Sequence, residues 1–410
     1  MGMRVGAALI VLLLLSAAAA AGCLSGGAGE GKTTSHGMVQ STGPSTSASP
    51  SGTSDFPSHT TTSSASTVAP SSSAAGGNAT ETQSTQAPER WSMELVWNAS
   101  TSGVPFMDMS PDGSLSAAVD FEGAKLYLVK PDGESVAFDV RGEDPVKPVI
   151  DGVAVKDGEA YVLADYTEFA GLRIYSWEGE RGEERHGWAG SVADDIARSP
   201  SGNHVCYLVT PNAGKQELYC DGKKLTLGSD EYELHSVSDS GVVVLGIGDK
   251  SLVVKEGERL LEINSGSVIA YKDRLLASED GKLRVYSLNG DVLAEKEGYT
   301  FKMTTLMRWT LVPTGKYLFR YEPLEEASVL TWNLTEVRTL PGFPYFANEN
   351  FVVMGDGNTL HCYSLKDFHE VFSVEVPDTV GYVRLSNDGK VLLVSGDTGG
   401  FWLYQAAYES

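Results

Sequence analysis

The sequence contains few cysteine, glutamine and basic residues, and each shortage limits the classes of protein to which it can belong. Only four of 410 residues are cysteine and five are glutamine, and 31 basic side chains face 54 acidic ones. Scarce glutamine is typical of heat-adapted proteins. The net charge of −23 argues against nucleic acid and anionic membrane surfaces as ligands, because binding either requires neutralising phosphates.

Catalytic signatures are also missing. No Gly-x-Ser-x-Gly elbow occurs, which argues against a serine hydrolase of the α/β type. The seven histidines have no metal-ligand spacing, and His369-Glu370 lacks the second histidine of a zinc protease. We therefore predict no catalytic residue, metal or cofactor from the sequence.

The N-terminus has the pattern of an export signal. Arg4 precedes an apolar run over residues 5–22, which ends in small residues before Cys23. Residues 20–23 resemble the lipobox of prokaryotic lipoproteins, bacterial or archaeal, with Ala20 where the bacterial form has Leu. The resemblance implies a signal peptide at 1–22 and lipidation of Cys23. The alternative is an uncleaved anchor, since about 17 apolar residues are the short limit for a spanning helix.

Both alternatives place residues 24–410 outside the cytoplasm, anchored to the outer face of the cell membrane. Residues 23–32 form a Gly-rich spacer next to the attachment point. Its residues 26–33 match the letters of a phosphate-binding loop, but the segment that follows cannot form the helix that such a loop needs.

Residues 33–88 are expected to be a disordered stalk. Of these 56 residues, 27 are serine or threonine, so the segment cannot bury enough surface to offset chain entropy. Exported proteins can carry N-linked sugar at Asn-x-Ser/Thr. The candidate sites are Asn78, Asn98 and Asn333.

Residues 89–410 form the folded domain, with 51 acidic and 29 basic residues, because only three acidic and two basic residues precede it. One apolar strand pattern recurs eight times in it, at 126–129, 172–175, 218–220, 252–254, 283–286, 329–332, 360–363 and 401–404. Upstream of the copies lie further hairpins with turns such as 110–113, 199–202, 238–241 and 386–389. Each of these turns leads into a β-rich run, and an acidic residue often ends such a run: Asp120, Asp165, Asp249, Asp280, Asp356, Asp397.

Four strands in every 31–46 residues and no amphipathic helix predict an all-β fold, a β-propeller of about eight four-stranded blades. Seven copies have a clear outer strand after them, whereas 401–404 has only 405–410. The unclaimed strand 91–98 is therefore predicted to join the C-terminal blade and close the ring, with seven blades and a different seam as the alternative.

The remaining cysteines suggest one disulfide. Cys206 and Cys220 lie on adjacent strands around the turn at 211–214, and pairing across that turn places them opposite each other. We predict a bridge between them, because oxidation is favoured outside the cell. Cys362 lies in an apolar strand and is expected to be buried.

Two local motifs are interpreted as turns. Residues 395–402 match the Asp-box spacing of sialidases, but only once and between the expected second and third strands. Asp108 begins a segment like a calcium loop, but Val119 stands where its twelfth-position glutamate would be.

Strings such as residues 110–120 and 125–133 resemble the WD-repeat-like propellers, including the Tol-associated periplasmic type. The resemblance covers nearly all of 91–410, although no Trp-Asp dipeptide ends a strand. It implies the fold but not one function, because such propellers bind, scaffold and catalyse.

We expect a monomeric, non-enzymatic binding or scaffolding domain for protein or glycan partners. The alternatives are an extracellular glycan- or peptide-processing enzyme and an assembly scaffold for a membrane complex. The candidates for a binding rim are the insertions 166–170 and 322–326 and the aromatics Trp188, Phe343 and Tyr345.

Overall fold

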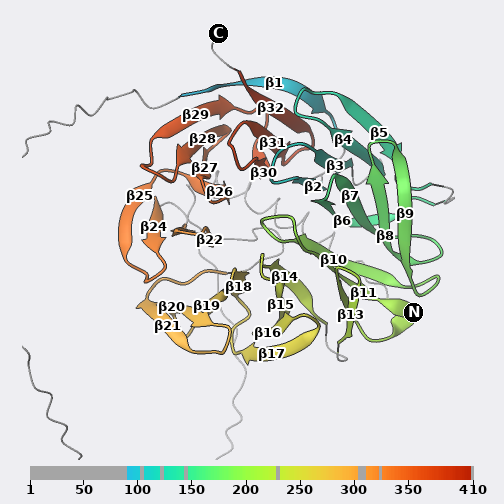
Figure 1. Cartoon of the computed structure of the whole chain (residues 1–410), viewed down its shortest axis with the longest axis horizontal. Helices are drawn as coiled ribbons and strands as arrows, with labels where there is room; N and C mark the ends of the chain where they lie inside the picture. Colours follow the sequence, from blue (N-terminus) through green and yellow to red (C-terminus); the bar gives the residue numbers. More distant parts are fainter. Residues whose placement is uncertain are drawn as a thin grey trace, which may run out of the picture. The chain divides into compact units, whose positions relative to one another are not determined.

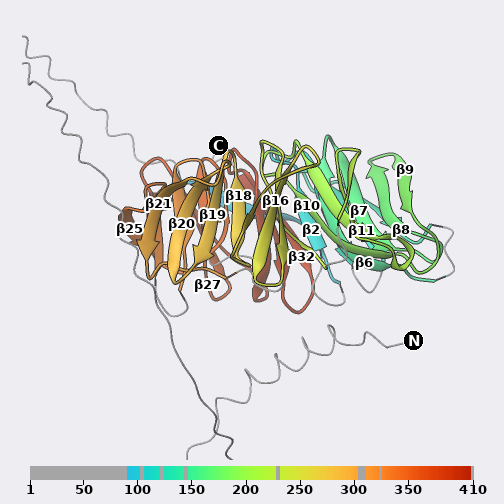
Figure 2. The same ribbon diagram turned by 90° about the horizontal axis from the view of Figure 1, so that it is seen from below.

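The computed structural model describes residues 90–101, 106–120, 124–142, 146–227, 231–302, 311–322 and 326–407. The predicted signal peptide, Cys23, the spacer, the stalk and Asn78 lie outside these residues. The described part forms eight four-stranded antiparallel sheets around a common centre, so the predicted eight-bladed β-propeller is confirmed (Figure 1). Seen from the side, the strands run across the thickness of the ring (Figure 2).

The strands of blades 1 to 4, from inner to outer, follow the chain in order. They are β2 (Phe106–Met109), β3 (Ser116–Asp120), β4 (Lys125–Val129) and β5 (Ser135–Asp139); β6 (Val149–Lys156), β7 (Glu159–Asp165), β8 (Ala170–Ser176) and β9 (Gly179–His186); β10 (Val192–Arg198), β11 (Val205–Thr210), β12 (Glu217–Cys220) and β13 (Lys223–Thr226); β14 (Glu233–Val237), β15 (Val242–Ile247), β16 (Lys250–Lys255) and β17 (Glu258–Ile263). A 3-10 turn, Pro211–Ala213, follows β11.

Blades 5 to 7 repeat this order, and blade 8 takes its outer strand from the other end of the domain. Their strands are β18 (Val268–Tyr271), β19 (Arg274–Glu279), β20 (Lys282–Ser287) and β21 (Val292–Glu297); β22 (Leu311–Pro313), β23 (Tyr317–Arg320), β24 (Ala327–Thr331) and β25 (Glu336–Leu340); β26 (Phe343–Ala347), β27 (Phe351–Asp356), β28 (Thr359–Ser364) and β29 (Glu370–Glu375); β30 (Val380–Leu385), β31 (Val391–Gly396), β32 (Phe401–Ala407) and β1 (Ser92–Ala99).

The predicted ring closure is confirmed, because β1 pairs with β32 as the outer strand of blade 8 (Figure 1). Trp91 and Met93 pack into the apolar core between blades 7 and 8, and Val96 and Trp97 pack into the core between blades 8 and 1. The backbone N–H of Trp91 also donates to the carbonyl of Val371 in blade 7, at 2.9 Å. The N-terminal strand thus joins three blades.

The core is divided among the seams between blades. Buried side chains of the described residues form eight clusters, and each cluster combines residues of two neighbouring blades. A central strand is therefore apolar on both faces, as in β31, where all six residues are buried. Each blade depends on both neighbours to cover its two faces.

The first hairpin turns repeat one hydrogen-bond arrangement, which explains the recurring Ser-x-x-Gly. In blade 1, Gly113 N–H donates to the carbonyl of Ser110 at 2.9 Å, and the Ser110 hydroxyl accepts from Leu115 N–H at 3.0 Å. Gly113 has a φ of +73°, which a side chain would strain. Blades 3, 4 and 8 use Ser199, Ser238 and Ser386 in the same way.

Deleting residues 91–98 should lower the melting temperature sharply, because it opens blade 8 and exposes the edge of β32. Deleting 33–88 should leave the melting temperature unchanged. Thermal unfolding of both deletion proteins, followed by circular dichroism, measures the difference. Equal melting temperatures would contradict closure by β1.

Candidate functional site

The two faces of the propeller differ in how their polar groups are used. Consecutive strands of a blade are antiparallel, so the first and second hairpin turns lie at opposite faces. We call the face with the turns 110–113, 199–202, 238–241 and 386–389 the turn face. The other, the open face, carries the ends of the second strands and the starts of the inner strands.

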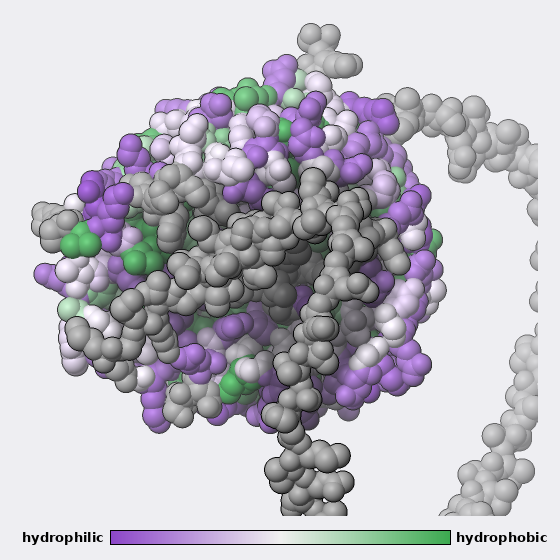
Figure 3. Space-filling view, turned by 180° about the vertical axis from the view of Figure 1, so that it is seen from behind, coloured by the Kyte–Doolittle hydropathy of each residue, from purple (hydrophilic) through white to green (hydrophobic). Residues whose placement is uncertain are grey.

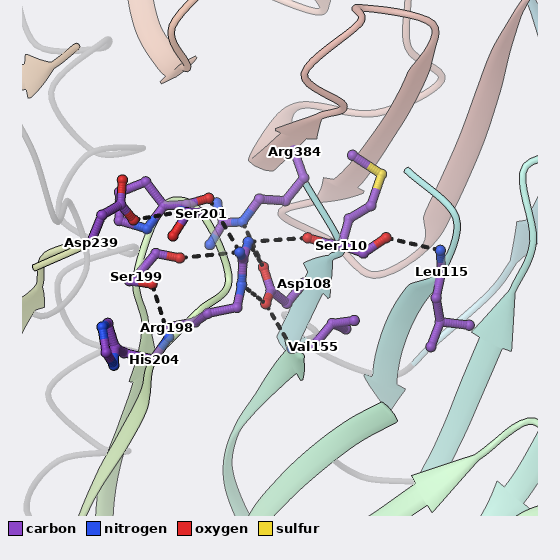
Figure 4. A network of polar contacts seen from close by, with 12 residues as sticks. Asp108, Ser110, Leu115, Val155, Arg198, Ser199, Ser201, His204, Asp239 and Arg384 are labelled. Carbon is purple, nitrogen blue, oxygen red and sulfur yellow. Dashed lines mark hydrogen bonds and ion pairs between the residues drawn. The ribbon is translucent and has the colours of Figure 1, made fainter. Parts of the chain in front are cut away.

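Asp108 is the centre of a polar network towards the turn face (Figure 4). Its buried carboxylate accepts from Arg198 of blade 3, with Nε–Oδ2 at 2.6 Å, and from Arg384 of blade 8, with Nε–Oδ1 at 3.2 Å. The backbone N–H of Val155 in blade 2 donates to Oδ2 at 2.8 Å. One carboxylate of blade 1 therefore joins four blades.

Opposite charge decides the ionisation of Asp108. Burial alone would raise the pKa of its carboxyl, but the guanidinium groups of Arg198 and Arg384 outweigh burial and lower that pKa. Asp108 is thus a structural anion, and the interpretation of its segment as a turn and not a calcium loop agrees with its hydrogen bonds.

Other contacts extend the network around the ring. Asp239 of blade 4 accepts from Ser201 N–H of blade 3 at 2.7 Å, and the Ser240 hydroxyl donates to the Lys272 carbonyl of blade 5 at 2.7 Å. Glu349 of blade 7 pairs with Lys272 at 2.9 Å. Many charged and polar side chains of the turn face therefore bond to other blades of the propeller.

Asp108→Asn should lower stability at neutral pH by about 3–5 kcal/mol, because breaking a buried ion pair leaves two guanidinium groups facing a neutral side chain. The lowered pKa means that this stabilisation is present above the ordinary carboxyl pKa and is lost as pH falls through the folded-state value. The gap between wild type and variant should therefore narrow in acid.

Denaturant unfolding from pH 3 to 8 measures the gap. The matched control is Asp249→Asn, since Asp249 is exposed at the end of the β15–β16 hairpin. Equal losses in both variants would contradict the role of Asp108.

The open face carries a carboxylate cluster between blades 2 and 3. Asp165, at the end of β7, accepts from Ala193 N–H of β10. Asp194 of β10 accepts from the Thr210 hydroxyl at 2.8 Å and from Gln216 Nε2 at 3.0 Å. Asp151 of β6 has a buried Oδ2 with no hydrogen-bond partner. None of the ion pairs among the described residues includes Asp151, Asp165 or Asp194.

The carboxyls of Asp151 and Asp165 retain protons to unusually high pH. Burial raises the pKa of Asp151 to about 9, and the neighbouring charges of Asp165, Asp194 and Asp195 add to the shift. Burial, together with Asp194, raises the pKa of Asp165 to about 6. Such a cluster can release its protons and bind a cationic group in their place, or it can donate a proton to a ligand.

The sequence identified only part of this cluster. Asp165 was recognisable as an acidic residue at the end of a second strand. Asp151 and Asp194 come from inner strands of two different blades, and no spacing in the chain signals their approach.

The predicted cysteine register is confirmed: Cys206 of β11 lies directly opposite Cys220 of β12, with Cα atoms 4.2 Å apart. The structure joins the two sulfur atoms as a disulfide. Cys362 is buried as expected, and burial raises the pKa of its thiol.

Protein isolated from its native surface should contain the Cys206–Cys220 bridge, which mass spectrometry of a non-reduced digest would detect. Closing this loop contributes up to about 3 kcal/mol in the chain-entropy model. Replacing both cysteines by serine should lower the melting temperature. Two free thiols in the native protein would contradict the prediction.

Two predicted glycosylation sites are accessible. Asn98 is exposed on β1, and Asn333 is exposed in the turn between β24 and β25. The Asn333 amide oxygen accepts from Thr335 N–H at 3.4 Å.

The predicted aromatic rim is only partly correct. Trp188 is 70% exposed, whereas Tyr166 and Phe169 in the 166–170 insertion are buried and stack on each other. Phe343 and Tyr345 are half-buried and pack edge to face. Their apolar rings are more stable in the seams than in water. Of the 322–326 insertion, residues 323–325 lie outside the described residues.

The Asp-box segment forms a turn between the second and third strands of blade 8, as expected. Gly396 N–H donates to the Gly400 carbonyl at 3.1 Å, and Asp378 accepts from Thr398 N–H at 3.1 Å.

A cavity of about 160 Å³ lies between blades 3 and 4, beside the disulfide, and its lining includes His204, Asp221 and Glu256. Ligand pockets usually measure about 300–1,000 Å³, so this one is small. Within the described ranges, no three His, Cys, Asp or Glu side chains are grouped to hold a metal ion. The same residues include no helix long and apolar enough to span a membrane.

The fold and its closure define a WD40-like β-propeller. The C-terminal WD40 domain of Sif2 is a similar solved structure, with a TM-score of 0.52 and 12% identity, covering 78% of this chain and 99% of that one. The WD40 domain of Neurospora crassa Pan2 has a TM-score of 0.45 and 9% identity, over 79% and 99% of the two chains.

No family model matches the sequence. Over 318 residues the chain is 64% identical to an uncharacterized protein of Archaeoglobus fulgidus, covering 78% of this chain and 90% of the relative. The chain belongs to the same family as this archaeal protein.

Proposed function

We propose that this protein is a lipid-anchored interaction module on the outer face of the cell membrane, which binds or scaffolds other proteins. The observation that carries the proposal is the closed WD40-like propeller, whose turn face uses its charged groups to hold blades together. On the open face, Asp151, Asp165 and Asp194 take part in no ion pair among the described residues, so we assign the partner to this face.

The proposed location at the membrane rests on the sequence. A signal at 1–22, lipidation at Cys23 and the stalk 33–88 would hold the propeller away from the lipid. An acidic surface keeps such a domain from lying on anionic headgroups.

An enzymatic function remains the second candidate. The raised pKa values of Asp151 and Asp165 favour it, because paired carboxyls with different pKa values suit acid–base chemistry. Binding is preferred because the exposed Val149 lies opposite Asp165, and exposed apolar side chains suit a protein partner.

Cys23→Ser should release the protein from the membrane fraction into the medium, or leave an unprocessed form, because no thiol remains to be lipidated. Cell fractionation with mass analysis of the N-terminus measures this. Unchanged membrane retention with an intact N-terminus would show that residues 5–21 span the bilayer. Surface cross-linking of the wild-type protein should yield a defined protein adduct, and its absence would contradict the interaction function.

A further inference from the structure

Exposed apolar side chains are unevenly distributed over the propeller. Nine large ones are exposed among the described residues. Five lie on outer strands: Leu95, Leu260, Val292, Leu293 and Val337. The other four, Val146, Val149, Trp188 and Val192, lie at or just before the starts of β6 and β10, on the open face of blades 2 and 3. We call these four the Trp188 patch.

Val149 and Val192 of the patch adjoin the carboxylate cluster through strand pairing. Val149 lies opposite Asp165 in the β6–β7 ladder, and Asp165 accepts from the backbone of Ala193. Val192 precedes Ala193 and lies opposite Thr210, whose hydroxyl donates to Asp194. Asp165 therefore lies between two exposed valines: it is paired with Val149 and bonded to the residue that follows Val192.

Trp188 is held in place by its backbone while its ring is exposed. Its N–H donates to the Asn212 side-chain oxygen at 3.0 Å, and its carbonyl accepts from Asn212 Nδ2 at 3.2 Å and from Ser191 N–H at 3.0 Å. A fixed, exposed tryptophan loses little entropy on binding and is the residue type most enriched in binding hot spots.

On the open face, which Figure 3 draws, hydrophobic residues form small spots separated by hydrophilic surface. Valine and tryptophan side chains at 40–70% exposure, among them Val149 opposite the half-buried Asp165, are costly in water unless a partner covers them.

We propose that the Trp188 patch binds an extended segment of a partner protein in which lysine or arginine alternates with apolar side chains. The apolar residues would cover Val149, Val192 and the Trp188 ring. The cations would neutralise Asp165 and its neighbours. Glycan hydroxyls would leave the valines uncovered, and phosphate headgroups would be repelled by the acids. This inference rests on the proposed interaction function.

Binding should depend on pH. The carboxyls that act on Asp165 or are acted on by it are Asp194 of β10 and Asp151 of β6, and Asp195 of β10 acts on Asp151. Because the pKa of Asp165 is about 6, its carboxylate is mostly charged only above that pH. A lysine-bearing segment should therefore bind more tightly at pH 7 than at pH 5, with protons released on binding.

The test uses the full chain in detergent and three synthetic peptides without histidine: one alternates lysine with leucine, one lysine with serine, and one glutamate with leucine. Calorimetry or fluorescence anisotropy measures their affinities. The lysine–leucine peptide should bind at least tenfold more tightly than the other two, and more tightly at pH 7 than at pH 5.

Trp188→Ala and Val149→Ser should each weaken this binding at least tenfold. Val292→Ser is the matched control, because Val149 and Val292 are both 52% exposed, and it should change nothing. Asp165→Asn can still accept from Ala193 N–H and should flatten the pH dependence. Equal effects of Val149→Ser and Val292→Ser, or equal binding of the three peptides, would overturn the inference.

Surface cross-linking separates this result from failure of the proposed function. If the wild type and Trp188→Ala capture the same partner protein equally well, the interaction function stands and the inferred patch is wrong. If the wild type captures no partner, the interaction function itself fails.

Discussion

The pairing of β1 with β32 is the constraint on which the rest of the domain depends. Every apolar cluster lies between two blades, so an incomplete blade 8 would uncover two clusters together. Trp91 at one end of β1 reaches blade 7, and Trp97 near the other end contacts Tyr127 of blade 1 at 5.7 Å between ring centroids. The first strand of the described chain therefore completes the last blade of the ring.

Ring closure holds the inner strands in one arrangement, and the polar groups at their two ends then have different surroundings on the two faces. On the turn face, Asp108 and Glu349 form ion pairs with basic side chains of other blades. On the open face, Asp151 and Asp165 repel each other and retain protons. The open face therefore carries an unfavourable electrostatic arrangement at Asp151 and Asp165 that a ligand can relieve.

Much of the fold could be predicted from the sequence, because strand patterns and turns are local. The Ser-x-x-Gly turns have a local hydrogen-bond cause at Ser110, and the missing outer strand after 401–404 indicated the seam. The register of Cys206 and Cys220 followed from one hairpin.

The site could be predicted much less well. Asp108 meets Arg198 and Arg384 across 90 and 276 residues of chain, and the Asp151 cluster combines two blades. The exposure of aromatic residues could not be predicted from the sequence either: Trp188 is exposed, but Tyr166 and Phe169 are buried in a seam between blades. Only the three-dimensional packing of neighbouring blades decides these cases.

The central claim, that partners meet the open face, can be tested directly on cells. A photo-cross-linking amino acid at Ala189, which is exposed beside Trp188, would sample that face, and one at the exposed Lys223 would sample the turn face of the same blade. The account predicts protein adducts from position 189 and few or none from position 223. Adducts mainly from position 223 would contradict it.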